Sequence, residues 1–170
     1  MMLFKFFIAI IVTLTSIAMA SFNSAGDDMK HIFMLAPFYP KLDDNSRSQY
    51  LAIAQNTQLT QDQMAEELAK WVEKQPQELQ KEMEKFGEKL INSLKYLGRA
   101  IIDYKFSSEA QSYGDKIKNI LNRTNITETE SDRQVSNVID SASPKIQQEL
   151  SKFLFWIGRE FINQVFKIIN

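Results

Sequence analysis

The fold is decided by the stretch from residue 77 to residue 104, QELQKEMEKFGEKLINSLKYLGRAIIDY. Its apolar side chains recur in steps of three and four, at Leu79, Met83, Phe86, Leu90, Leu94, Leu97, Ile101 and Tyr104. This spacing places a single apolar stripe along a helix of ~42 Å, because each residue adds about 1.5 Å. The opposite face alternates glutamate and lysine, as is typical of a solvated surface. The stretch therefore predicts one long amphipathic helix near residues 77–104.

Shorter helical patterns flank this long helix on both sides. Thr60-x-x-Gln63 and Thr127-x-x-Glu130 are capping boxes, in which a hydroxyl and a side chain three residues later each satisfy a free backbone amide. The expected helix starts are Ser46, Thr60, Ser107 or Ser108, Thr127, and the pair Ser143-Pro144. No segment alternates in the manner of a strand. We therefore expect an all-α fold, a single helical bundle of about five to six helices.

Residues 1–20 have the composition of a secretory leader. Lys5 precedes an apolar run from Phe6 to Ile17, and Ala18-Met19-Ala20 supplies small residues for cleavage after Ala20. A membrane anchor is the alternative, but a bilayer core needs roughly 20 apolar residues. We therefore expect a secreted, extracellular protein with a leader at 1–20, an extended N-terminal arm at 21–45 and a helical domain at 46–170.

Composition argues against several functions. The chain has 20 basic and 21 acidic residues, so it lacks the basic excess typical of nucleic-acid binding. It has no cysteine, and its single histidine, His31, lies in the expected arm. Thiol chemistry is thereby excluded, and a lone histidine has no second imidazole with which to build a zinc site. We expect a protein that is not an enzyme and has no catalytic residues.

Divalent-cation binding is the one site chemistry that the residue pattern leaves open. The segment from Asn56 to Glu67 approaches the spacing of a calcium-binding loop, but Gln61 replaces the glycine at its sixth place. Asp62, Glu66 and Glu67 remain as candidate ligands of a weak surface site for Mg²⁺ or Ca²⁺.

Two adjacent sequons lie in an expected loop. Asn122-Arg123-Thr124 and Asn125-Ile126-Thr127 each satisfy N-x-S/T, so Asn122 and Asn125 are candidate sites of N-glycosylation in an exported chain.

The end of the chain is apolar around more than half of its helical circumference. Leu150, Phe153, Ile157, Phe161 and Ile168 form one stripe, and Phe155, Ile162, Phe166 and Ile169 form another. Such a helix is either buried on all sides or contacts a second apolar partner. A central core helix, a lipid site, a membrane contact and a homo-dimer interface are the alternatives, and Trp71 is a further candidate for the apolar surface.

Part of the chain resembles the SXP/RAL family of secreted nematode proteins. The resemblance rests on YLAIAQNTQLT from Tyr50 to Thr60 and on LAKWVEKQ from Leu68 to Gln75. Two later segments, Ser107–Ala110 and Ser143–Leu150, look like the family's turn before its fourth helix and its closing helix. The likeness covers about residues 46–153, which leaves an extra apolar C-terminal helix up to residue 170.

The resemblance implies a secreted helical protein with a cation-binding domain of the Anisakis-allergen type, which the host recognises as an antigen. We therefore expect a binding protein with weak divalent-cation binding and no catalysis. The alternatives are a small carrier of a fatty acid or retinoid, with a site between Trp71, the face from Leu94 to Ile101 and the last helix, or a membrane-surface binder. A lipid, a host protein or a second copy of the chain is the expected partner.

Overall fold

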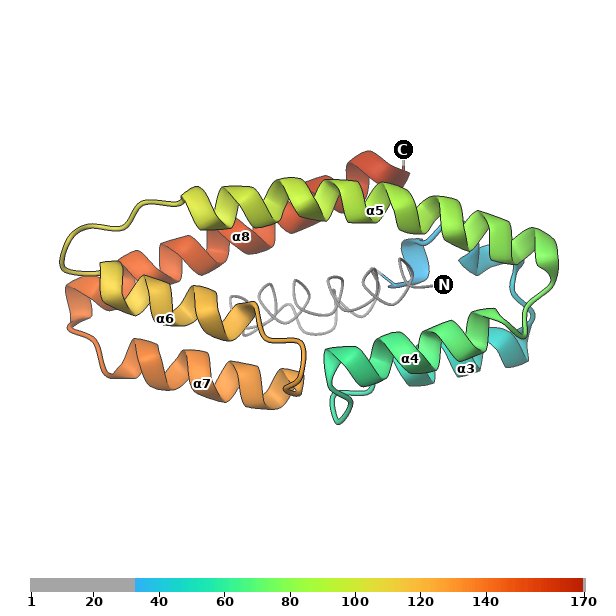
Figure 1. Ribbon diagram of the computed structural model, residues 1–170, viewed down its shortest axis with the longest axis horizontal. Coiled ribbons are helices and arrows are strands. Elements are labelled where there is room, and N and C mark those ends of the chain that lie inside the picture. Colours follow the sequence, from blue (N-terminus) through green and yellow to red (C-terminus); the bar gives the residue numbers. More distant parts are fainter. Residues whose placement is uncertain (1–32, 170) are drawn as a thin grey trace.

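Residues 33–169 are described by a computed structural model and form six α-helices preceded by two 3₁₀ turns (Figure 1). The elements are η1 Phe33–Leu35, η2 Tyr39–Lys41, α3 Asp44–Ala54, α4 Gln61–Val72, α5 Gln77–Asp103, α6 Gln111–Leu121, α7 Glu128–Asp140 and α8 Pro144–Ile169. Within this range the only extended pairing is an isolated antiparallel bridge between Thr60 and Thr127. The all-α expectation is confirmed. The predicted leader, residues 21–32 of the predicted arm and His31 lie outside the described residues.

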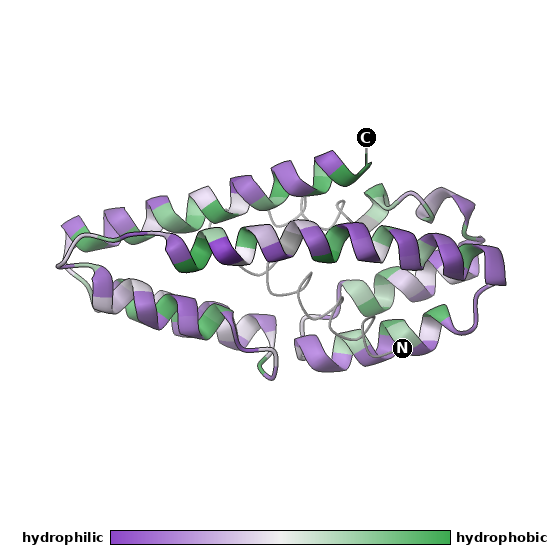
Figure 2. Cartoon of the chain, turned by 45° about the horizontal axis from the view of Figure 1, so that its top comes forward, coloured by the Kyte–Doolittle hydropathy of each residue, from purple (hydrophilic) through white to green (hydrophobic). Residues whose placement is uncertain are grey.

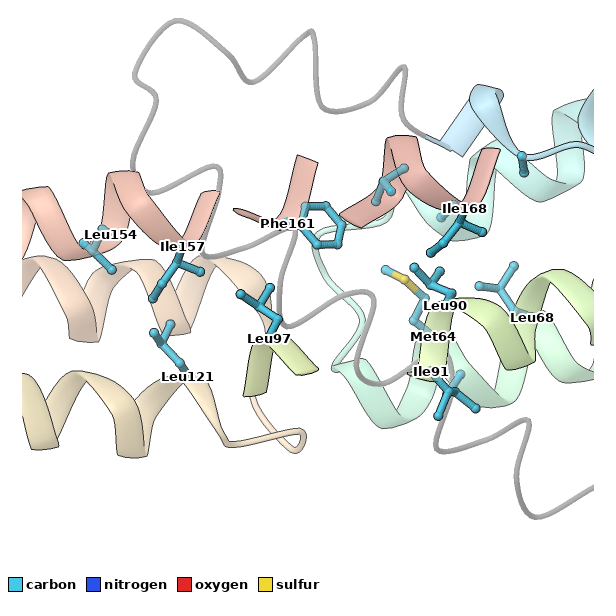
Figure 3. Packing of buried hydrophobic residues seen from close by; sticks show 14 of the residues in the cluster. Met64, Leu68, Leu90, Ile91, Leu97, Leu121, Leu154, Ile157, Phe161 and Ile168 are labelled. Carbon is cyan, nitrogen blue, oxygen red and sulfur yellow. The ribbon is translucent and has the colours of Figure 1, made fainter. Parts of the chain in front are cut away.

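Two long helices and two short hairpins make up the molecule. α5 and α8 lie side by side and run in opposite directions, with the α3–α4 hairpin beneath one end and the α6–α7 hairpin beneath the other (Figure 1). Hydrophobic and hydrophilic residues lie largely on different sides of α5 (Figure 2). Figure 3 shows Leu121 of α6 directed toward Ile157 of α8, and Leu90 of α5 close to Met64 of α4. The core therefore lies between the long helices and the hairpins.

The helix predicted near residues 77–104 is α5. Met83, Leu90 and Leu97 of the predicted stripe are buried in the core. The last turn of α5 is closed from outside the helix, because the Lys118 ammonium donates to the carbonyl oxygen of Ile102 and to that of Tyr104, at 3.0 Å each. A cation at this end also complements the helix dipole.

One of the two predicted capping boxes is complete and the other is half formed. The Gln63 amide donates to the Thr60 hydroxyl at 3.2 Å, and the Thr60 amide donates to Gln63 Oε1 at 2.9 Å. Thr127 likewise accepts from the Glu130 amide at 3.2 Å. However, the Glu130 carboxylate accepts from Arg133 instead of returning to Thr127. A charge-assisted hydrogen bond is stronger than one to a neutral amide, so Glu130 binds Arg133 rather than the amide of Thr127.

Two boundaries differ from the expectation. α6 begins at Gln111 rather than at Ser107 or Ser108, and Ser107 starts the turn that leads into it. The Ser107 hydroxyl accepts from the Ala110 amide at 3.3 Å and its carbonyl oxygen accepts from the Gln111 amide at 2.9 Å, while Glu149 accepts from the amide and the hydroxyl of Ser107 at 2.7 Å each. α8 is continuous from Pro144 to Ile169, so the extra C-terminal helix is the second half of the helix that begins at Pro144. None of the helices between residues 33 and 169 is long and apolar enough to cross a membrane.

The described chain consists of two similar halves. α3, α4 and α5 have 11, 12 and 27 residues, and α6, α7 and α8 have 11, 13 and 26. In each half a threonine caps the second helix, and these two threonines, Thr60 and Thr127, pair with each other across the bridge. The bridge therefore lies between equivalent positions of the two halves.

The contacts that hold each half together are repeated as well. The ring of Phe38 meets that of Phe86 edge-on at 5.9 Å, and Phe106 meets Phe153 edge-on at 4.8 Å. The segment Ala36–Leu42, the end of the predicted arm, thus packs before α3 as Tyr104–Ala110 packs before α6. Ala36, Phe38 and Leu42 are accordingly buried. This part of the predicted arm is therefore docked on the helices.

Candidate functional site

α8 carries apolar side chains on two sides. Its inner side is buried and contains Leu150, Phe153, Leu154, Ile157, Phe161, Val165 and Ile168. On the other side Phe155 and Phe166 are each 49% exposed, whereas Ile162 and Ile169 are partly buried. The structure therefore places Phe155, Ile162 and Phe166 of the predicted second stripe along one side of α8, away from its buried side, whereas Ile169 packs against the core.

Two basic side chains lie among these apolar ones. Lys152, Phe155, Arg159, Ile162 and Phe166 follow one another in steps of three and four residues, and helical spacing places them on one side of α8. We call these five residues the outward face of α8. Lys152 and Arg159 are exposed, and neither has an ion pair among the residues that the structure describes.

A shallow groove of about 460 Å³ runs along the first half of this face. Its lining residues are Gln148, Ser151, Lys152, Phe155, Trp156 and Arg159. The Trp156 ring is held in place by Tyr104 and Phe153, at centroid distances of 5.3 and 6.2 Å. The groove thus combines an aromatic floor with two cations, and none of its lining residues is acidic. This arrangement suits a partner that has both apolar surface and negative charge.

Sequence reasoning missed the basic part of this face. Lys152 and Arg159 were not among the candidate residues, although they share the helical face of Phe155. Their position identifies them, because Lys152 lies three residues before the exposed Phe155 and Arg159 lies four residues after it, each about one helical turn away.

Trp71 does not join the outward face. Its side chain is 3% exposed and packs against the ring of Tyr50 at 5.3 Å, in the α3–α4 hairpin. Burial raises the pKa of the Tyr50 hydroxyl above its usual value. The indole Nε1 of Trp71 is buried without a hydrogen-bond partner among the described residues. Trp71 is therefore a core residue on the inward-facing apolar stripe of α4, apart from the outward face of α8.

The candidate metal ligands Asp62, Glu66 and Glu67 all lie on α4 and do not form a cage. Asp62 Oδ2 accepts from the Thr124 hydroxyl at 3.2 Å, and Glu67 pairs with Lys70 at 2.8 Å. Residues 33–169 contain no group of three or more acidic or histidine side chains that could hold a metal. The second half of the calcium-loop-like segment is helical, so its oxygens cannot wrap around one point. These residues do not fit a tight hard-cation site.

Both candidate glycosylation residues are accessible. Asn122 and Asn125 are exposed in the loop between α6 and α7. This loop is fastened to α4, because the Asp62 amide donates to the carbonyl oxygen of Thr124 at 3.1 Å and the Thr124 hydroxyl donates to Asp62. The structure thus presents the two asparagines to solvent on an anchored loop.

Fold and surface together define the class: a cysteine-free helical protein made of two similar helix triplets, with an exposed apolar and basic helix face. The chain belongs to the SXP/RAL-2 family. Residues 2–163 match the family described as SXP/RAL-2 family protein Ani s 5-like, metal-binding domain. No curated protein and no solved structure matches the chain. The family match also extends into the second half of α8, beyond the 46–153 range of the sequence resemblance.

Proposed function

We propose that this chain is an exported, non-catalytic binding protein whose binding surface is the outward face of α8. The observation that carries the proposal is that Phe155 and Phe166 are each half exposed on a helix whose opposite side is already buried in the core. Docking α8 on the bundle requires only one apolar stripe. The second stripe therefore supports a role in binding.

Covering the exposed phenylalanines of this face would contribute an appreciable binding free energy. Complete burial of a phenylalanine side chain contributes about 1.5–3 kcal/mol, so covering the remaining half of Phe166 contributes roughly 1 kcal/mol. Contiguous exposed apolar groups on a soluble domain commonly mark interaction sites. A lipid, a host protein or a second copy of the chain would each supply the missing cover.

A fluorescent apolar dye such as anilinonaphthalene sulfonate tests this surface directly. Phe166→Asn should reduce dye fluorescence at saturation and weaken binding about fivefold, because it removes roughly 1 kcal/mol of apolar contact. Phe166→Leu keeps most of the apolar area and serves as the matched control. Equal dye binding by the parent, Phe166→Asn and Phe166→Leu would show that this face is not the binding surface.

Export and glycosylation belong to the same proposal. The leader-like residues 1–20 support cleavage after Ala20, and the exposed Asn122 and Asn125 support glycan attachment at one or both. N-terminal sequencing of material secreted by expressing cells should begin at Ser21, and an N-glycosidase should increase its electrophoretic mobility. A secreted chain that begins at Met1, or one retained in the cell membrane, would contradict the export proposal.

Divalent-cation binding is a second candidate function, favoured by the family's metal-binding label. Because Asp62 and Glu67 already have hydrogen-bonding partners, a cation would have to displace them. We therefore propose weak binding of Ca²⁺ or Mg²⁺, with a dissociation constant of roughly micromolar to millimolar. Titration calorimetry at physiological salt, with Asp62→Asn/Glu66→Gln as the comparison variant, measures it. A nanomolar site would show that other residues form the metal site.

A further inference from the structure

We propose that the outward face of α8 docks on a membrane surface rich in anionic phospholipid. This inference rests on the proposed function and names the partner of that same surface. An anionic membrane is the occupant that fits, because the face offers apolar side chains together with the positive charges of Lys152 and Arg159, neither of which forms a direct ion pair among the described residues.

The charge of the outward face favours a negatively charged partner. The whole chain has 20 basic and 21 acidic residues. The lack of carboxylates on this face therefore does not simply reflect an excess of basic residues in the chain. Lys152 and Arg159 lie beside Phe155, and none of the residues that line the groove is acidic. Basic side chains near an anionic leaflet are attracted by its negative surface potential, each strengthening binding about fivefold. The partner that complements this face is therefore negatively charged.

The length and side-chain arrangement of the outward face also suit a membrane surface. From Lys152 to Phe166 the face runs for ~21 Å along a single helix, as expected for a helix that lies in the plane of a membrane. Phenylalanine and isoleucine side chains would enter the acyl boundary, whereas the long stems of Lys152 and Arg159 can keep their charges among the headgroups. The partly exposed Trp156, fixed against Tyr104 and Phe153, belongs to the residue type that prefers this boundary.

A second copy of the chain fits this face less well. In a two-fold dimer the same patch meets itself, so Lys152 and Arg159 would approach the corresponding basic residues of the other copy. Two acidic residues lie near this face but not on it. Glu160 is turned by about 100° from Arg159, and Glu149, whose pKa Lys152 helps to lower, is already bound by the amide and hydroxyl of Ser107. Charge therefore favours an anionic surface over self-association.

Vesicle co-sedimentation tests the proposal with protein recovered from the medium of secreting cells. The parent should bind vesicles of phosphatidylcholine containing about one third phosphatidylserine at least tenfold more tightly than vesicles of phosphatidylcholine alone, and binding should weaken at high salt. Lys152→Gln/Arg159→Gln should reduce binding to the anionic vesicles roughly 25-fold, at about fivefold for each charge removed. Phe166→Asn should reduce it about fivefold.

The matched control removes the same charge elsewhere. Lys74→Gln/Lys116→Gln changes two exposed lysines that lie outside α8, and it should bind within twofold of the parent. All variants are compared after their circular dichroism spectra and melting temperatures are shown to agree. An equal loss in this control, equal binding to neutral vesicles or insensitivity to salt would each overturn the proposal.

The outcomes separate this inference from the proposed function. If dye binding depends on Phe166 but anionic vesicles do not bind, the outward face is a binding surface and lipid is the wrong partner. If analytical ultracentrifugation also shows a dimer that Phe166→Asn dissociates, the occupant is a second copy. If neither dye nor vesicle binding responds to Phe166, both the inference and the proposed function fail.

Discussion

Gly114 illustrates how a single position is constrained by an aromatic ring packed on a helix. It is buried in α6, and a Cβ built at this position would lie 2.6 Å from Cζ of Phe106. Phe106 is itself fixed by Tyr104 and Phe153. We expect Gly114→Ala to lower the free energy of unfolding by about 1–3 kcal/mol, because overpacking outweighs the better helix propensity of alanine. Urea denaturation measures the change.

Gly98 provides the matched control for this prediction. It also lies within a helix, α5, but nothing lies within 4 Å of a Cβ at this position. Gly98→Ala should therefore raise the free energy of unfolding by up to about 1 kcal/mol through helix propensity alone. If both substitutions change stability in the same direction, contact with Phe106 does not control the response at position 114.

Asp132 predicts a dependence of stability on pH. Burial on α7 raises its pKa to about 6, so the folded protein binds a proton that the unfolded chain has already released. Its destabilising effect is therefore absent below the unfolded pKa and grows as pH rises through 6. Asp132→Asn should raise the free energy of unfolding at pH 7.5 by about 1 kcal/mol, after allowance for partial exposure, and should leave it nearly unchanged near pH 4. Thermal melts at the two pH values test this.

Glu130, on the same helix, has a pKa shifted in the opposite direction. The guanidinium of Arg133 and the amide of Gln134 hydrogen-bond to its carboxylate and lower its pKa to about 2. Its stabilising contribution is thus present above the unfolded pKa and is lost as pH falls through 2. Glu130→Gln should therefore be no more stable than the parent at pH 7.5. A gain equal to that of Asp132→Asn would contradict the assignment of the two environments.

Lys118 links α6 to the end of α5. Its ammonium donates to the carbonyl oxygens of Ile102 and Tyr104 and lies 5.3 Å from the centre of the Phe106 ring. Lys118→Met keeps the aliphatic stem but leaves those carbonyls without their donor. We expect a loss of about 1–2 kcal/mol in unfolding free energy, together with faster hydrogen exchange in the last turn of α5. Lys116→Met, two residues away and exposed, should change neither quantity appreciably.

Elements whose stability is decided locally were predictable from sequence, and elements fixed by distant partners were not. The bounds of α5 follow from its uninterrupted stripe, and the start of α4 follows from Thr60 and Gln63. The start of α6 follows only in part from its own residues, because Ser107, which begins the turn before it, is also bound by Glu149 of α8. Similarly, the apolar side chains of the outward face were visible in the sequence, whereas which of them stay exposed depended on how α8 packs on the bundle.

At the scale of the whole molecule, the two hairpins are joined near Asp62. Its amide and carboxylate both bind Thr124, next to the bridge between Thr60 and Thr127. Asp62→Ala removes the carboxylate contact, so we expect the loop between α6 and α7 to exchange its amide hydrogens faster, with a stability loss of about 0.5–1.5 kcal/mol. Hydrogen–deuterium exchange read by mass spectrometry locates the effect. Faster exchange throughout both hairpins would instead indicate global destabilisation.

The similarity of the two halves could not be detected in the sequence, because equivalent positions share a packing role rather than a residue type. Phe86 and Phe153 have the same role and are identical, but Lys41 contacts Glu82 where Ser107 contacts Glu149. The first contact is an ion pair and the second a pair of hydrogen bonds. Only the three-dimensional arrangement reveals that both fasten a connecting segment to a long helix.

The bridge between Thr60 and Thr127 lies where a two-fold axis would pass if the halves were identical. Two separate copies of a three-helix chain could meet in this way, each supplying one threonine and one long helix to a symmetric pair. The segment Tyr104–Ala110 then corresponds to the link that would fuse such a pair into one chain. Fusion releases each half from the need to match the other, so one half can keep a buried aromatic pair, Tyr50 and Trp71, while the other develops a different exterior on α8. The architecture is the one that a symmetric homodimer of three-helix chains would have if its two copies were joined in a single polypeptide.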